Sequence, residues 1–286
     1  GVQTYTNVNI EEIIPFIDWT PFFISWEMKE KYPQILDSEK YAEQARNLLR
    51  DAKEMLTKIS SKNWLRLNSK IGIWQAKKEG DDVLLFEDGI TLETFNFLRQ
   101  QSKKTKNNLC LADYISEDKE DYIGAFVCTA GLNIEKQLQV FESELDDYNS
   151  ILLKSLADRL AEALTEYMHK KVRKEIWGYS SNENYSNEQL IKEEYNGIRP
   201  APGYTACPDH TEKKKIFKLL NASEIGVSLT ENMAMYPNAT ISGYYFSHPE
   251  SKYFSVGKIQ EDQIEDYANR KNIKINEVEK WLRSNI

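Results

Sequence analysis

The residues best suited to chemistry lie in one stretch, residues 197–210, with the sequence GIRPAPGYTACPDH. Its three prolines and two glycines exclude the interior of a helix or of a central strand, because proline fixes φ and removes a backbone donor. A loop this stiff holds its carbonyl groups and the guanidinium of Arg199 in a set arrangement. Preorganisation of this kind favours a ligand site, because little entropy is lost on binding. A rigid connector between two elements is the alternative interpretation of the same composition.

Two carboxylates outside this loop are candidates for ligand contact. Asp18 is set among aromatic residues in the apolar run 10–26, where a carboxylate is costly unless it is paired or meets a ligand cation. Its alternative role is to cap the turn that follows it. Glu162 lies on a long helical pattern, two positions from the leucines on either side, so the periodicity predicts a solvent-facing side chain.

Conventional catalytic signatures are missing from the sequence. It contains no glycine-rich phosphate-binding motif and no Gly-x-Ser-x-Gly elbow. Cys207, His210 and His248 are candidate metal ligands, with Asp209 nearby, but their spacing matches no zinc pattern. The chain is instead rich in aromatic residues and carboxylates near stiff loops, which favours binding of a cationic or aromatic small molecule over acid–base catalysis.

The bulk composition narrows the class of protein. The 286 residues are 41% hydrophobic and 12% aromatic, values typical of a globular chain with a large core. The net charge of −8 argues against nucleic acid as the main partner. No apolar run approaches the ~18 residues of a membrane span. Three widely separated cysteines indicate no disulfide framework and favour a reducing cytoplasm, and the first residue, Gly1, suggests a fragment of a longer polypeptide.

Hydrophobic periodicity predicts helices and strands in alternation along the chain. The spacing of Ser186 and Gln189, and of Asp209 and Glu212, predicts a capping box on either side of the proline-rich loop. Residues 91–103 fit either a helix or a strand–helix junction. Predicted helices cover 37–59, 133–176 without a break, 213–220, 260–271 and 275–284, and predicted strands cover 70–76, 82–87, 122–129, 227–235 and a hairpin formed by 239–247 and 252–259.

The motifs also resemble a known family. Arg199-Pro-Ala-Pro-Gly203-Tyr204, continuing as Cys207-Pro-x-His210-Thr-Glu, is similar to the Arg-x-x-x-Gly-Tyr signature of the S-adenosylmethionine-binding activation domain of cobalamin-dependent methionine synthase. The similarity extends over nearly the whole chain, with separate motifs in the same order. These motifs begin at Asp18 (DWTPFF), Ala157 (ADRLAE), Ser242 (SGYYFSHPESKY) and Gln260 (QEDQIEDYA).

The resemblance implies a single C-shaped α+β domain over residues 1–286, with a twisted antiparallel sheet surrounded by helices. It implies a module of a methyltransferase that binds S-adenosylmethionine for reductive methylation of cobalamin. The implied partners are the cobalamin-binding domain of the same enzyme, which holds the cobalamin, and a flavodoxin or equivalent reductase. On its own the module is expected to bind ligand without making methionine. A free-standing reactivation or docking module for another corrinoid protein is the alternative.

The resemblance also implies the ligand contacts, and these include no catalytic acid or base and no metal ligand. Arg199 would pair with the ligand carboxylate as a fork, and Asp18 would take its ammonium. Tyr204 and Tyr253 would offer ring faces or hydroxyls to the adenosyl group or sulfonium. Phe254 replaces a tyrosine common in the family, so only ring packing or a backbone contact is expected there. The remaining implied positions are Ala201, Gly203, Glu162 and Glu193.

Overall fold

The protein is described by a computed structural model that covers residues 1–103 and 107–286. Its centre is an antiparallel sheet built on two long strands, β2 (Arg66–Glu79) and β5 (Asp121–Leu132). The strand order is β4-β3-β2-β5-β8, and β1 also pairs with β2. The other strands of this sheet are β1 (Val2–Tyr5), β3 (Asp82–Glu87), β4 (Ile90–Asn96) and β8 (Thr240–Tyr245).

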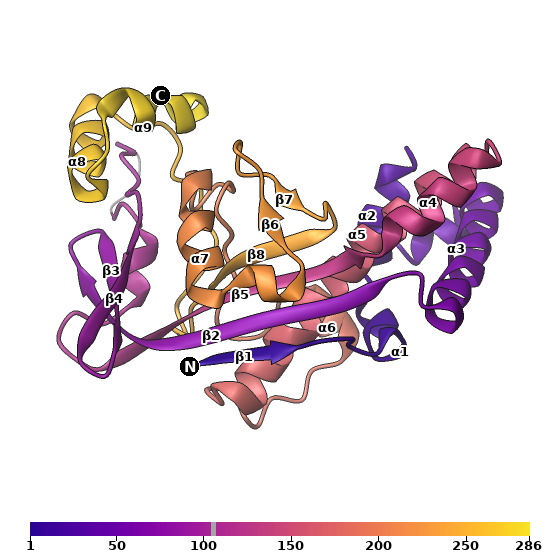
Figure 1. Ribbon diagram of the computed structural model, residues 1–286, viewed down its shortest axis with the longest axis horizontal. Helices are drawn as coiled ribbons and strands as arrows, with labels where there is room; N and C mark the ends of the chain where they lie inside the picture. The colour runs from indigo at the N-terminus through magenta and orange to yellow at the C-terminus, as the bar shows by residue number, and fades with distance from the viewer. Residues whose placement is uncertain (104–106) are drawn as a thin grey trace.

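Helices surround the sheet, so the α+β class expected from the resemblance is confirmed. Figure 1 shows α2 to α5 gathered at one end of the long strands, and α8 and α9 beside the β3–β4 hairpin at the other. Both ends rise to the same side of β2 and β5, with α7 and the small β6–β7 pair between them. Within the described ranges, no helix is long and apolar enough to cross a lipid bilayer. The bounds are α1 (Ile10–Ile13), α2 (Trp19–Ser25), α3 (Ala42–Lys62), α4 (Ile134–Ser143), α5 (Asp147–Lys171), α6 (Asn187–Ile191), α7 (Lys213–Leu220), α8 (Glu261–Lys271), α9 (Ile275–Trp281), β6 (Ser228–Leu229) and β7 (Met235–Tyr236).

Helix α5 is the element that carries the core and one wall of the site. Its leucines at 153, 156, 160 and 164 are fully buried, and it packs against β5 and β8. Burying each such leucine stabilises the fold by roughly 1.5–3 kcal/mol. A π-helical turn (Val172–Ile176) continues the helix and leads into the segment before α6.

The predicted unbroken helix over 133–176 is wrong. The chain leaves helical geometry between α4 and α5, where Leu145 adopts a left-handed φ of 57°. Asp146 then begins α5, because its side chain accepts a hydrogen bond from the backbone N of Asn149 at 3.0 Å. An N-cap of this kind satisfies a donor that the helix start leaves free, so two helices replace one.

The predicted hairpin of 239–247 with 252–259 is also wrong in its second strand. Strand β8 is present, but residues 252–259 form no strand. The free edge of β8 is occupied by the proline-rich loop instead. Ile198 exchanges two backbone hydrogen bonds of 3.0 Å with Phe246, and Tyr244 N donates to Pro200 O at 2.9 Å. Residues 252–259 therefore find no edge to pair with.

Other predictions hold with adjusted limits. The predicted strands 70–76 and 82–87 are confirmed as β2 and β3, and so are the helices α3, α7, α8 and α9. Residues 91–103 begin as strand β4 and contain no helix, and 227–235 becomes the short β6–β7 pair. The Ser186–Gln189 capping box is confirmed. Glu212 does not complete the predicted Asp209–Glu212 capping box, because its carboxylate forms ion pairs with Lys271 and Lys215.

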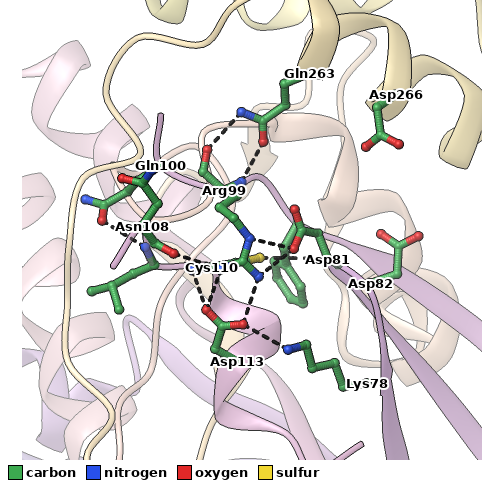
Figure 2. A network of polar contacts seen from close by, with 12 residues as sticks. Lys78, Asp81, Asp82, Arg99, Gln100, Asn108, Cys110, Asp113, Gln263 and Asp266 are labelled. Atoms are coloured by element: carbon green, nitrogen blue, oxygen red, sulfur yellow. Dashed lines mark hydrogen bonds and ion pairs between the residues drawn. The ribbon is translucent and has the colours of Figure 1, made fainter. Parts of the chain in front are cut away.

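The C-terminal helices are fastened to the β3–β4 hairpin by polar contacts as well as by apolar packing. Figure 2 shows Arg99 between two carboxylates, with Asp81 Oδ1 2.6 Å from Nη2 and Asp113 Oδ2 2.7 Å from Nη1. Gln263 of α8 accepts from the backbone N of Arg99 at 2.6 Å and donates to its carbonyl at 2.8 Å. These paired bonds fix α8 against the chain that leaves β4.

Candidate functional site

The proline-rich loop is a compact double turn laid against β8. Gly203 N donates to Cys207 O at 2.7 Å, Tyr204 N to Ala201 O at 3.2 Å, and Cys207 N to Tyr204 O at 3.0 Å. Gly203 has a φ of 97°, a conformation that side-chain-bearing residues rarely adopt. The turn leaves the ring of Tyr204 largely exposed. The stiff loop predicted from composition therefore acts as a platform on the sheet edge.

Arg199 leaves this loop and meets charged groups from two other segments. Its Nη1 lies 2.7 Å from Oε2 of Glu166 on α5 and also donates to the hydroxyl of Tyr195. Its Nη2 lies 3.5 Å from Oε1 of Glu193, beyond the C-terminal end of α6. Its backbone N donates to the hydroxyl of Tyr253 at 3.1 Å. The guanidinium is thus held at the meeting point of α5, the α6 segment and the loop.

A cavity of about 360 Å³ opens beside Arg199. Phe126 of β5 and Thr165 of α5 are among the residues that line it. Six of the nine residues that the resemblance implies as ligand contacts line it together, although they come from three separate parts of the chain. These six are Glu162, Glu193, Arg199, Ala201, Tyr204 and Tyr253.

The cavity is acidic, because two carboxylates line it beside one guanidinium. Burial raises the pKa of both the Glu162 and Glu193 carboxyls, and nearby guanidinium groups offset this only in part. Glu162 is exposed to solvent, as the periodicity predicts, and it also lines the cavity. Burial alone would lower the pKa of Arg199, yet Glu166 together with Tyr195, Tyr253 and Glu193 outweighs burial and holds that pKa well above its ordinary value. The cavity thus combines two carboxyls with raised pKa values, whose charged forms a cation would stabilise, and one guanidinium that stays protonated.

Comparison with known proteins decides the family. The family model described as "Vitamin B12 dependent methionine synthase, activation domain" matches residues 9–272. The chain belongs to this family. Among solved structures, the "Crystal Structure of the MetH Reactivation Domain bound to AdoHcy" is 49% identical to this activation domain, with a TM-score of 0.97. That match covers 100% of this chain and 90% of the other.

Three of the implied contacts do not line the cavity of the activation domain. Asp18 is the N-cap of α2 and accepts from Thr20 N at 2.9 Å, so its capping role is confirmed and its ligand role stays a prediction. Gly203 acts through the turn it permits. Phe254 presents its carbonyl to Thr205 Oγ1 at 3.1 Å, and its ring packs between two parts of the core.

The sequence-based interpretation missed the charged layer beneath Arg199. Glu166 and His169 on α5, together with Arg173 in the π-helical turn, are all buried there. Glu162, Glu166, His169 and Arg173 follow one another at intervals of four, three and four residues, the spacing of a single helix face. That polar stripe could have been recognised in the sequence of the activation domain.

The candidate metal ligands have other surroundings in the described part of the chain. Cys207 is buried, His210 packs under the loop at Gly203, and His248 lies beside the ring of Tyr114 with centroids 5.9 Å apart. Across residues 1–103 and 107–286, no group of three His, Cys, Asp or Glu side chains is placed to hold a metal ion.

Proposed function

We propose that this activation domain binds S-adenosylmethionine in the cavity beside Arg199 and presents its methyl group to cobalamin held by another domain of methionine synthase. The observation that carries the proposal is the convergence of one guanidinium, two carboxylates and two tyrosines on a single cavity. S-adenosylmethionine carries one carboxylate, one ammonium and one sulfonium. The charges of the site complement this set group by group.

Arg199 would bind the ligand carboxylate. Its Nη1 is engaged by Glu166, while Nη2 lies toward Glu193 on the cavity side. A guanidinium already neutralised in part can still form charge-assisted hydrogen bonds through its remaining donors. Because the charge of Glu166 favours the protonated guanidinium and helps to hold the pKa of Arg199 well above its ordinary value, it would present a permanent cation to the carboxylate.

Glu162 and Glu193 would face the positive groups of the ligand. Each is an ionisable carboxyl whose charged form is disfavoured by its surroundings, and a sulfonium or ammonium would remove that penalty. Tyr204 and Tyr253 would add ring faces, which attract sulfonium and ammonium groups and pack against adenine. Tyr253 also fixes the loop through its bond to Arg199 N.

No acid or base is needed for the proposed reaction. Transfer of a methyl group from sulfonium is a direct displacement, and cobalamin supplies the nucleophile when bound by its own domain. The contribution of this chain is to hold the donor in one orientation and to shield it with the loop. We therefore assign no catalytic residue.

The wider setting belongs to the same proposal. The chain would act as one domain of a cytoplasmic methyltransferase. Its partners would be the cobalamin domain of that enzyme, and a flavodoxin or equivalent reductase that supplies the electron for reductive methylation. By itself the chain would bind S-adenosylmethionine without producing methionine.

Titration calorimetry with S-adenosylmethionine tests the proposal. We expect the wild-type chain to bind and Arg199→Ala to lose about tenfold or more in affinity, the scale of a lost charge-assisted contact. Arg46→Ala is the matched control, because Arg46 is an exposed arginine on α3 paired only with the exposed Asp37 among the ion pairs described. Failure of the folded wild type to bind, or equal affinity of Arg199→Ala, would refute the proposal.

A further inference from the structure

Glu166 lies beneath the cavity and is sandwiched between two arginines. Its Oε2 is 2.7 Å from Arg199 Nη1, and its Oε1 is 3.7 Å from Arg173 Nη2. The hydroxyl of Tyr195 donates to the same Oε2 at 3.1 Å. The side chain of Glu166 is only 6% exposed, so solvent contributes little to its charge balance. A carboxylate so placed is held by its cationic partners.

Arg173 in turn is fixed independently of Arg199. It is completely buried, its Nε donates to Glu183 Oε2 at 2.8 Å, and its guanidinium lies 3.6 Å from the centroid of the Tyr195 ring. On its far side Glu166 thus forms an ion pair of 3.7 Å with a buried guanidinium that Glu183 also binds. The chain of contacts from Glu183 through Arg173 to Glu166 ends at Arg199.

This arrangement decides which edge of Arg199 faces the cavity. Nη1 is turned inward to Glu166, Tyr195 and Nδ1 of His169, which is 3.3 Å away. His169 is buried, and burial together with the two arginines holds its pKa well below the usual value, so its imidazole is neutral and can accept from Arg199. Nη2 is left on the side of Glu193 and the cavity.

We propose that Glu166 is the positioning residue for Arg199: it anchors Nη1 so that the opposite edge of the guanidinium is presented to a ligand carboxylate. The inference rests on the proposed function, in which Arg199 binds that carboxylate. Without Glu166, the nearest carboxylate to Arg199 would be Glu193, and the guanidinium would turn toward it. The donor needed by the ligand would then be engaged by the protein.

The proposal is testable, because positioning by Glu166 and the charge of Glu166 predict opposite changes in affinity when that charge is removed. Removing the negative charge of Glu166 would strengthen the attraction of Arg199 for an incoming carboxylate if orientation did not matter. Positioning predicts that the same substitution weakens it. The sign of the change in affinity therefore separates the two effects.

The experiment compares S-adenosylmethionine with its decarboxylated analogue, which keeps the sulfonium, ammonium and adenosine. Affinities are measured by calorimetry for the wild type, Glu166→Gln and Arg199→Ala. We expect Glu166→Gln to lose about tenfold for S-adenosylmethionine and less than about threefold for the analogue. Glu93→Gln is the matched control, because Glu93 is a largely buried carboxylate on β4 that pairs with Lys218 and takes no part in this chain of contacts. It should keep the wild-type preference between the two ligands.

Stability is followed in parallel by thermal unfolding, and Tyr195→Phe provides a second variant if Glu166→Gln fails to fold. Tyr195 bonds both Glu166 and Arg199, so its loss should reduce the preference for the carboxylated ligand in the same direction. If the wild type does not distinguish the two ligands, the proposed role of Arg199 fails and this inference with it. If the wild type distinguishes them and Glu166→Gln keeps or increases the preference, positioning by Glu166 alone is refuted.

Discussion

The imidazole of His210 lies where a side chain at residue 203 would have to go. A Cβ built on Gly203 would be 2.2 Å from His210 Cε1, well inside van der Waals contact. The imidazole is restrained by Lys213, whose Nζ lies 3.0 Å from His210 Nδ1. Lys213 is itself fixed, because its Nζ donates to Met233 O at 3.0 Å. The turn that carries Tyr204 therefore closes only over a glycine.

Gly203→Ala should lower the free energy of unfolding by at least about 2 kcal/mol, because strain at positive φ adds to the clash with His210. Gly80→Ala is the control, since Gly80 also has positive φ but its Cβ would meet nothing within 4 Å. That variant should cost only about 1 kcal/mol. Urea denaturation measures both, and equal losses would show that His210 yields to the new side chain.

Lys271→Met should destabilise the protein by about 3–5 kcal/mol, because it removes the cation paired with the buried Asp209 and one of the two cations paired with the buried Glu212. Lys271 Nζ lies 2.6 Å from Asp209 Oδ2 and 2.7 Å from Glu212 Oε1, and all three side chains are at most 7% exposed. The exposed Lys274, just beyond α8, offers Lys274→Met as a control that should change stability little. A loss below about 1 kcal/mol in chemical denaturation would contradict the prediction.

Asp113 should make the protein lose stability in acid. Burial alone would raise its pKa, but hydrogen bonds from Arg99, Cys110 N and Lys78 lower it to about 2, against about 3.9 in an unfolded chain (Figure 2). A depressed carboxyl pKa stabilises the fold above the unfolded value, and this contribution disappears as pH falls from about 4 toward 2.

The stabilisation by Asp113 is expected to be about 1 kcal/mol, since the side chain keeps some contact with solvent that screens its charge. Unfolding free energies of the wild type and Asp113→Asn at pH 5 and pH 3 measure it. The difference in unfolding free energy between the wild type and Asp113→Asn should be smaller at pH 3 than at pH 5. A constant gap would show that Asp113 titrates alike in both states.

Binding of S-adenosylmethionine should release protons and strengthen as pH rises through the range in which Glu162 titrates. Burial raises the pKa of this carboxyl above its ordinary value near 4.3, and a nearby cation would bring it down. The pH range in which binding releases a proton from Glu162 thus begins at about pH 4.3 and extends upward. Calorimetry at pH 5 in two buffers of different ionisation enthalpy measures the release.

Glu162→Gln should reduce this proton release, and Glu193 would account for the remainder because burial also raises its pKa. Glu142→Gln, on the exposed surface of α4, should leave the release unchanged. Proton uptake on binding, or a release unaffected by Glu162→Gln, would show that this carboxyl does not meet the cation.

Residue-level conformational preferences and short motifs were enough to locate much of the site in the sequence. Three prolines and Gly203 predicted a stiff loop around Arg199, since φ restriction is a property of the residue itself. The Ser186–Gln189 box predicted the start of α6, because capping needs only residues three apart. The family motifs added Glu193 and Tyr253 as contacts, which the structure places around one cavity.

Only the tertiary structure decided what those residues meet. Residues 252–259 have the alternation of a strand, yet the proline-rich loop occupies the edge of β8. Neither segment's own sequence shows which of the two will pair with that edge. Glu166 is 33 positions before Arg199, and its partner depends on how α5 packs against the sheet. The sequence by itself determined the residue chemistry and the local geometry of the loop. Packing between distant elements decided which charges are paired inside the protein and which face the cavity, because burial and pairing arise only when those elements meet.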